Sequence, residues 1–125
     1  MKITHFTKPK GLITLAAAVI LIIDPNLILQ LLGAQLEAAG VMMTRILGGA
    51  YLVSGIGIWS IKGPVDISTR DAWLYVLGES IAAASVFLAV SIGALNLIGW
   101  GLALAYVLFV CGFVYVALQT RQLNM

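Results

Sequence analysis

The chain has 125 residues, of which 62% are hydrophobic and 10% are charged, and its formal net charge is +2. Its mean hydropathy of +1.07 excludes an ordinary soluble domain, in which about a quarter of the residues are charged. The seven basic residues are scattered along the chain and form no nucleic-acid-binding surface, so we expect no nucleic-acid partner. Since a membrane-spanning helix needs about 20 residues, we expect residues 1–125 to form one transmembrane domain of four spans in the lipid bilayer.

The first predicted span covers residues 10–24. A lysine-bearing start followed by an apolar run is typical of a signal peptide, but this run continues into Asp24-Pro25 without a small-x-small cleavage pattern, which predicts an uncleaved helix. Aspartate is a preferred N-cap and proline a preferred first helical residue, so Asp24-Pro25 predicts a short interfacial helix over 25–33. The alternative is one kinked helix over 11–32.

The other predicted spans cover residues 41–61, 72–92 and 97–118. Lys62-Gly63-Pro64 ends the second span, because glycine followed by proline stops a helix. Only residues 94–96 separate the last two spans, which predicts an antiparallel hairpin. The expected fold is therefore an all-α, integral membrane four-helix bundle.

The basic residues predict the orientation of the spans. Six of them fall on one side of a four-span arrangement, namely Lys2, Lys8, Lys10, Lys62, Arg70 and Arg121. Cytoplasmic loops carry an excess of lysine and arginine, so we expect both termini to be cytoplasmic. We further expect the membrane to be a bacterial inner membrane.

Small residues predict where the helices contact one another. Helices in lipid gain no hydrophobic energy on association, so their contacts are enriched in residues that allow close backbone approach. Gly78-xxx-Ala82 in the third span and Gly101-xxx-Ala105 in the fourth follow this pattern. We expect both faces to point into the bundle.

Three ionisable residues fall within or at the end of a predicted span: Asp24, Arg45 and Glu79. Such residues are costly in lipid and are candidates for functional sites. At about 1.5 Å per residue, Asp24 and Arg45 lie at a similar height near the outer face, so we predict an ion pair between them that locks the first loop.

Glu79 is expected about 12 Å above the start of its span, at the height of Ser54. We predict an intramembrane polar site in which Ser54 is the hydrogen-bond partner of Glu79. A buried carboxyl group without a cation tends to be protonated. The site would either fix helix packing or couple proton movement to a substrate.

The sequence offers little for other chemistry. One histidine, His5, and one cysteine, Cys111, predict no zinc or bis-histidine haem site, and we expect no cofactor. Nothing pairs a nucleophile with a base, so we expect no catalytic residue and no enzyme. The fourth span is the most aromatic. Its Tyr106, Phe109, Phe113 and Tyr115 either pack in the bundle or line a groove for a quinone, sterol or pigment.

The order of several motifs resembles a known group. The first span ends in Asp24-Pro25, the short helix closes at Leu32-Gly33, and the second span contains Arg45-Ile46-Leu47-Gly48-Gly49-Ala50-Tyr51 and ends at Trp59. This pattern is similar to that of uncharacterised small four-helix bacterial membrane proteins grouped with DoxX-like families. The resemblance implies the four-helix fold and carries over little activity.

We therefore expect a small membrane protein without a catalytic site, acting as an accessory or assembly subunit of a larger membrane complex. Its partner would be another membrane protein or further copies of itself. Two alternatives stay open. One is a small oligomeric transporter or channel with Glu79 as its coupling residue, and the other is a protein that binds a hydrophobic, quinone-like ligand.

Overall fold

The computed structural model describes residues 2–125, which form five helices and no strand. The helices are α1 (Thr4–Ile23), α2 (Pro25–Leu31), α3 (Ala38–Ser60), α4 (Thr69–Ser91) and α5 (Ile98–Leu123). All except α2 are long and apolar enough to cross a membrane. The predicted all-α fold with four apolar helices is confirmed.

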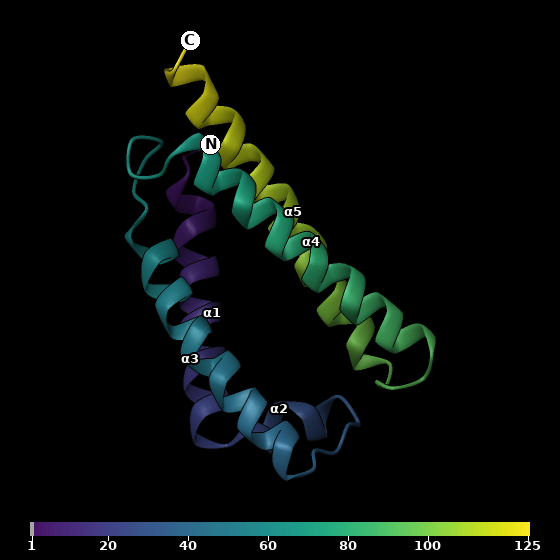
Figure 1. Cartoon of the computed structure of the whole chain (residues 1–125). Helices are drawn as coiled ribbons and strands as arrows, with labels where there is room; N and C mark the ends of the chain where they lie inside the picture. The colour runs from purple at the N-terminus through teal and green to yellow at the C-terminus, as the bar shows by residue number, and fades with distance from the viewer. Residues whose placement is uncertain (1) are drawn as a thin grey trace.

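The long helices form two antiparallel pairs, α1 with α3 and α4 with α5 (Figure 1). The pairs meet at the end that holds both chain termini and diverge along their length. At the other end, Asn96 connects them: its side chain donates to the Leu31 carbonyl and its backbone N–H to the Leu32 carbonyl, each at 2.8 Å. The two pairs are thus joined at both ends, while their backbones diverge between them.

The hydrophobic core lies where the two pairs meet beside the termini. It consists of Ile3, Ile61, Ala72, Val116 and Ala117. Next to it, the fully buried Phe113 ring meets Phe6 edge-on at 4.9 Å and stacks on Tyr75 at 4.7 Å. Aromatic pairs in these two geometries are favourable beyond the area that they bury. This end therefore fixes how one helix pair sits on the other.

Glycines allow α1 and α3 to approach closely. A Cβ atom added to Gly11 would lie 2.8 Å from the backbone nitrogen of Trp59, and one added to Gly55 would lie 3.1 Å from that of Leu15. By contrast, an added Cβ at Gly78 or Gly101 has no neighbour within 4 Å. Neither glycine makes the close helix contact that its spacing predicts: Gly78 faces the space between the two helix pairs, and Gly101 is exposed.

The chain breaks between α1 and α2, as Asp24-Pro25 predicts. Asp24 leaves the helical region, with φ −136° and ψ 82°, and Pro25 begins α2 as its first residue. The separate short helix is confirmed, and the alternative of one kinked helix over 11–32 is wrong. At the end of α2, Gly33 takes φ +77°, a conformation that side-chain-bearing residues rarely adopt.

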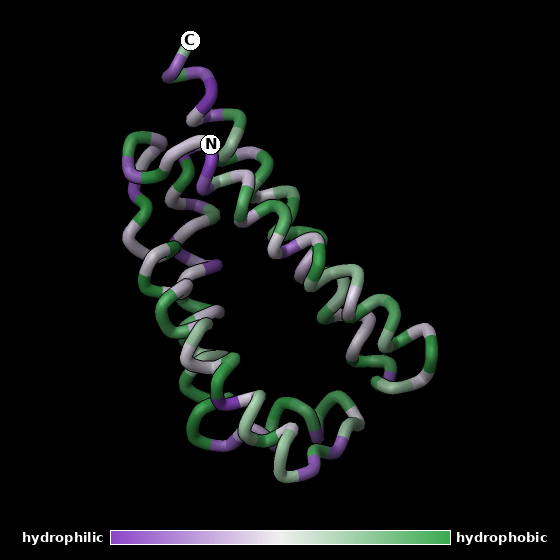
Figure 2. The backbone as a smooth tube through the Cα atoms, in the orientation of Figure 1, coloured by the Kyte–Doolittle hydropathy of each residue, from purple (hydrophilic) through white to green (hydrophobic). Residues whose placement is uncertain are grey.

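The helix α1 begins earlier than the predicted span, at Thr4, and contains Pro9. Pro9 lies in the second turn of α1, and since proline has no N–H, the His5 carbonyl lacks its usual helical donor. Contacts with α3 hold these extra residues, since the Thr7 hydroxyl donates to the Ile61 carbonyl at 2.8 Å. Figure 2 shows that hydrophilic residues concentrate at the two ends of the molecule.

Candidate functional site

A cavity of about 530 Å³ lies between the two helix pairs. Its lining combines charged, hydroxyl-bearing and small apolar side chains from four helices. The lining residues are Lys10, Thr14, Leu47, Ala50, Tyr51, Ser54, Asp71, Leu74, Tyr75, Gly78, Glu79, Ala82 and Tyr106. A cavity whose exposed surface is mainly apolar, but onto which several polar groups converge, is typical of small-ligand sites.

An ion pair between Lys10 and Glu79 forms part of the cavity wall. The Lys10 Nζ lies 2.9 Å from the Glu79 Oε1, and the two side chains are only 7% and 12% exposed. Lys10 Nζ also lies 4.0 Å from the centre of the Phe109 ring, within cation–π range. Because isolated buried charges are strongly disfavoured, each of these two groups depends on the other.

Backbone geometry explains the pairing. Lys10 lies six residues, or about 9 Å, into α1, and Glu79 lies ten residues, or about 15 Å, into α4. Both helices start at the end of the molecule that holds the termini (Figure 1). The four-carbon stem of lysine spans the difference in height, so a residue one and a half turns inside α1 reaches a carboxylate nearly three turns inside α4.

Two buried oxygen atoms of the cavity lining have no hydrogen-bond partner, and one of them belongs to Glu79 itself. They are the Glu79 Oε2 and the Thr14 Oγ1. Buried polar groups are nearly always paired, and an unpaired one costs free energy. The polar wall is therefore not fully satisfied by the protein's own side chains.

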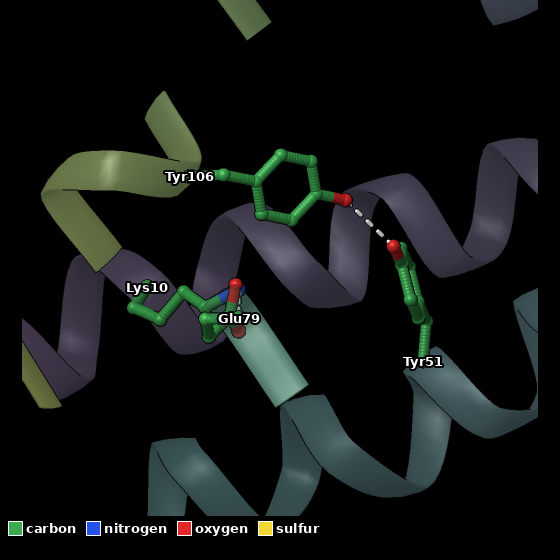
Figure 3. A network of polar contacts seen from close by, with 4 residues as sticks. All are labelled: Lys10, Tyr51, Glu79 and Tyr106. Carbon is green, nitrogen blue, oxygen red and sulfur yellow. Dashed lines mark hydrogen bonds and ion pairs between the residues drawn. The ribbon is translucent and has the colours of Figure 1, made fainter. Parts of the chain in front are cut away.

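Two tyrosines form a bridge across the cavity from opposite helix pairs. The hydroxyls of Tyr51 on α3 and Tyr106 on α5 are 2.7 Å apart, and either can be the donor (Figure 3). Figure 3 shows this bridge together with the Lys10–Glu79 pair, and all four residues line the cavity. Each contact joins the α1/α3 pair to the α4/α5 pair.

The exposed residues of the lining belong to α3 and α4, from which we infer that the mouth of the cavity lies between these helices. The lining residues on these two helices include exposed apolar side chains, with Leu47 at 45% and Leu74 at 53% exposed. Lining residues at the back, Lys10 and Thr14, are buried. The polar groups thus lie behind a mouth bordered by apolar side chains.

The predicted site residues Glu79 and Ser54 both line this cavity. Their predicted hydrogen bond is wrong, because Glu79 pairs with Lys10 through one oxygen and its other oxygen has no partner. The distribution of basic residues predicts Lys10 at the cytoplasmic surface, together with Lys2 and Lys8. The earlier start of α1 places it inside the bundle instead.

The predicted ion pair between Asp24 and Arg45 is also wrong. In the described part of the chain these residues form no ion pair, and both are exposed. Gly48, one turn after Arg45, takes the position against α1: its added Cβ would lie 3.2 Å from the Ala18 carbonyl oxygen. Such close backbone contact leaves the longer Arg45 side chain outside the interface.

Sequence reasoning missed Lys10, Thr14, Tyr51 and Tyr75 as site residues, although one signal was present. Leu47, Ala50, Tyr51 and Ser54 lie at i, i+3, i+4 and i+7, the spacing of a single helical face. Tyr75 and Glu79 are likewise four residues apart. Polar residues that recur on one face of each of two successive apolar helices, Tyr51 with Ser54 and Tyr75 with Glu79, indicate that the two faces line a common internal surface.

Other site types find no support in the described residues. Within 2–125, no three histidine, cysteine or acidic side chains are gathered as a metal site would require. Comparison of the chain with protein-family models, curated proteins and solved structures finds no match. The class that the fold and cavity define is a protein of four long apolar helices, paired two by two around a cavity that contains polar side chains.

Proposed function

We propose that this chain is a membrane protein that binds a small, largely apolar ligand in the cavity between its helix pairs. The observation that carries the proposal is the cavity itself. It places a buried ion pair and a tyrosine bridge behind a mouth bordered by exposed apolar residues. Polar side chains inside membrane helices are costly and mark sites of binding or transfer.

The proposal includes four membrane crossings with both termini in the cytoplasm of a bacterial cell. Both termini lie at one end of the molecule, and so do the start of α4 and the end of α3 (Figure 1). Five of the basic residues belong to this end: Lys2, Lys8, Lys62, Arg70 and Arg121. Lys10 no longer counts toward the orientation, because it is buried against Glu79. The remaining excess of basic residues still supports this orientation.

In such a membrane the cavity mouth between α3 and α4 would face lipid, near the middle of the spans. Tyr51 lies nine residues, or about 14 Å, from the end of α3, and Glu79 about 15 Å from the start of α4. A ligand would then reach the polar groups by moving sideways from the bilayer. This route favours a molecule that partitions into lipid.

Gly78 provides a sharp test of ligand binding. It lines the cavity, and a Cβ there meets open space, so the leucine of Gly78→Leu should project into the cavity and obstruct it without disturbing packing. Gly101→Leu is the matched control, because Gly101 also meets open space but does not line the cavity. The tagged proteins would be purified from native membranes in mild detergent, and bound compounds extracted and identified by mass spectrometry.

We expect a defined apolar compound to accompany the wild-type protein and Gly101→Leu and to be lost from Gly78→Leu. Equal recovery from all three, or from none, would contradict binding in this cavity. The same preparations test the accessory-subunit hypothesis, which stays a prediction. A stoichiometric protein partner that is retained by Gly78→Leu would favour it.

The ion pair favours a second candidate, transport coupled to protonation. Protonating Glu79 would release Lys10 from its partner at 2.9 Å, which changes the charges on the cavity wall. The double variant Lys10→Met with Glu79→Gln removes both charges together. Proton-coupled transport predicts that this variant still binds the identified compound but no longer moves it across proteoliposome membranes in response to a pH gradient. Unimpaired movement would exclude Glu79 as a coupling residue.

A further inference from the structure

We infer that the ligand presents a neutral hydrogen-bond acceptor, a carbonyl oxygen, to the bridge between Tyr51 and Tyr106. This inference rests on the proposed ligand binding and adds the chemical class of the ligand. The ligand would be a carbonyl-bearing apolar molecule whose hydrocarbon part lies along the apolar lining of the cavity.

The tyrosine bridge has one hydroxyl hydrogen more than it uses. Each phenol carries one hydrogen, and the contact of 2.7 Å uses only one of the two. Whichever tyrosine accepts therefore keeps a hydrogen of its own, and among residues 2–125 no other acceptor is bonded to Tyr51 or Tyr106. A part-buried hydroxyl hydrogen without an acceptor is unfavourable, so the bridge has one donor available to a ligand.

The unpaired acceptors of the cavity lie out of a ligand's reach, so the free tyrosine hydrogen is the unsatisfied group that a ligand can meet. The Glu79 Oε2 and the Thr14 Oγ1 are unpaired, yet both atoms are fully buried beneath the cavity wall. A ligand in the cavity would not contact them without rearranging that wall. The polar groups within reach are instead hydroxyls, and those of Ser54 and Tyr75 already bond to each other.

The charges of the lining explain why the acceptor should be neutral. Lys10 and Glu79 compensate each other at 2.9 Å, and the remaining charged lining residue is Asp71. A carboxylate or phosphate ligand would thus meet a net negative wall. The apolar lining residues Leu47, Leu74 and Ala82 suit a hydrocarbon chain.

Infrared spectroscopy tests this hydrogen bond directly. The probe is 2-pentadecanone with ¹³C at its carbonyl, added to the full-length protein in lipid nanodiscs, so that its band is separate from lipid ester carbonyls. A bare carbonyl in hydrocarbon accepts no hydrogen bond, whereas one bound to a tyrosine hydroxyl absorbs at lower wavenumber. We expect a shifted band that saturates at one probe per protein.

The variants give a pattern that a merely structural role would not produce. Tyr51→Phe and Tyr106→Phe each leave one hydroxyl with a free hydrogen, so each single variant should keep the shifted band. The double variant has neither donor and should lose it, with binding weaker by about fivefold or more. Tyr115→Phe, on the same helix but outside the cavity lining, is the matched control and should behave like the wild type.

A shifted band that survives in the double variant, or that never forms in the wild type, would overturn the inference. Thermal unfolding of each variant shows whether it is folded. A failed double variant would be replaced by Tyr51→Leu with Tyr106→Leu. The proposed function fails separately: a hydrocarbon or alcohol recovered from the wild type and lost in Gly78→Leu would preserve ligand binding while contradicting the carbonyl assignment.

Discussion

At the scale of single residues, the Lys10–Glu79 pair places two charged groups in the interior of the molecule, where each is stable only beside the other. Both side chains are almost completely buried, so removing one charge leaves the other without a partner. We predict that Glu79→Gln lowers the free energy of unfolding by about 3 kcal/mol, and that adding Lys10→Met restores most of it. Unfolding in detergent micelles, followed by tryptophan fluorescence, measures both. The exposed Glu37 provides the control, since Glu37→Gln should change little.

Two buried threonines of α1 give a second prediction at this scale. The Thr7 hydroxyl donates to the Ile61 carbonyl, whereas the Thr14 hydroxyl has no partner. The same substitution should therefore act in opposite directions: Thr7→Val destabilises by about 1 kcal/mol, and Thr14→Val is neutral or stabilising. If Thr14→Val destabilises as much as Thr7→Val in the same unfolding assay, a buried water bonds to Thr14.

At the scale of helices, close backbone contact between α1 and α3 depends on small residues at particular positions. An alanine at Gly11 would place its Cβ 2.8 Å from the Trp59 backbone, while one at Gly49 meets nothing within 4 Å. We predict that Gly11→Ala destabilises by about 2 kcal/mol, whereas Gly49→Ala is neutral or stabilising by up to about 1 kcal/mol because alanine favours helix. Equal effects of the two substitutions on thermal unfolding would contradict the packing of this pair.

The same scale shows what the sequence could predict. Apolar runs indicated the four long helices, and Asp24-Pro25 indicated the break before α2, because both signals are local. Glu79 was identified because a carboxylate in an apolar run is conspicuous on its own. Its partner Lys10 was not identified, because that assignment requires the start of α1 and its packing against α4. Both depend on tertiary structure. Gly78 and Gly101 fit the small-residue pattern as well as Gly11 does, and only packing distinguishes them.

At the scale of the whole molecule, the arrangement of charged ends predicts the orientation in the membrane. Lys62 and Arg121 lie at the end that holds the termini, while Glu37 precedes α3 at the opposite end. In a Cys111→Ala background, which removes the exposed native thiol, Glu37→Cys should react with a membrane-impermeant maleimide in intact cells. Asn124→Cys should react only after the cells are permeabilised, because basic residues keep their end in the cytoplasm. The reverse pattern would place the termini outside. Labelling of both cysteines in intact cells would mean that the chain inserts in two orientations, in which case the excess of basic residues is too weak to fix one.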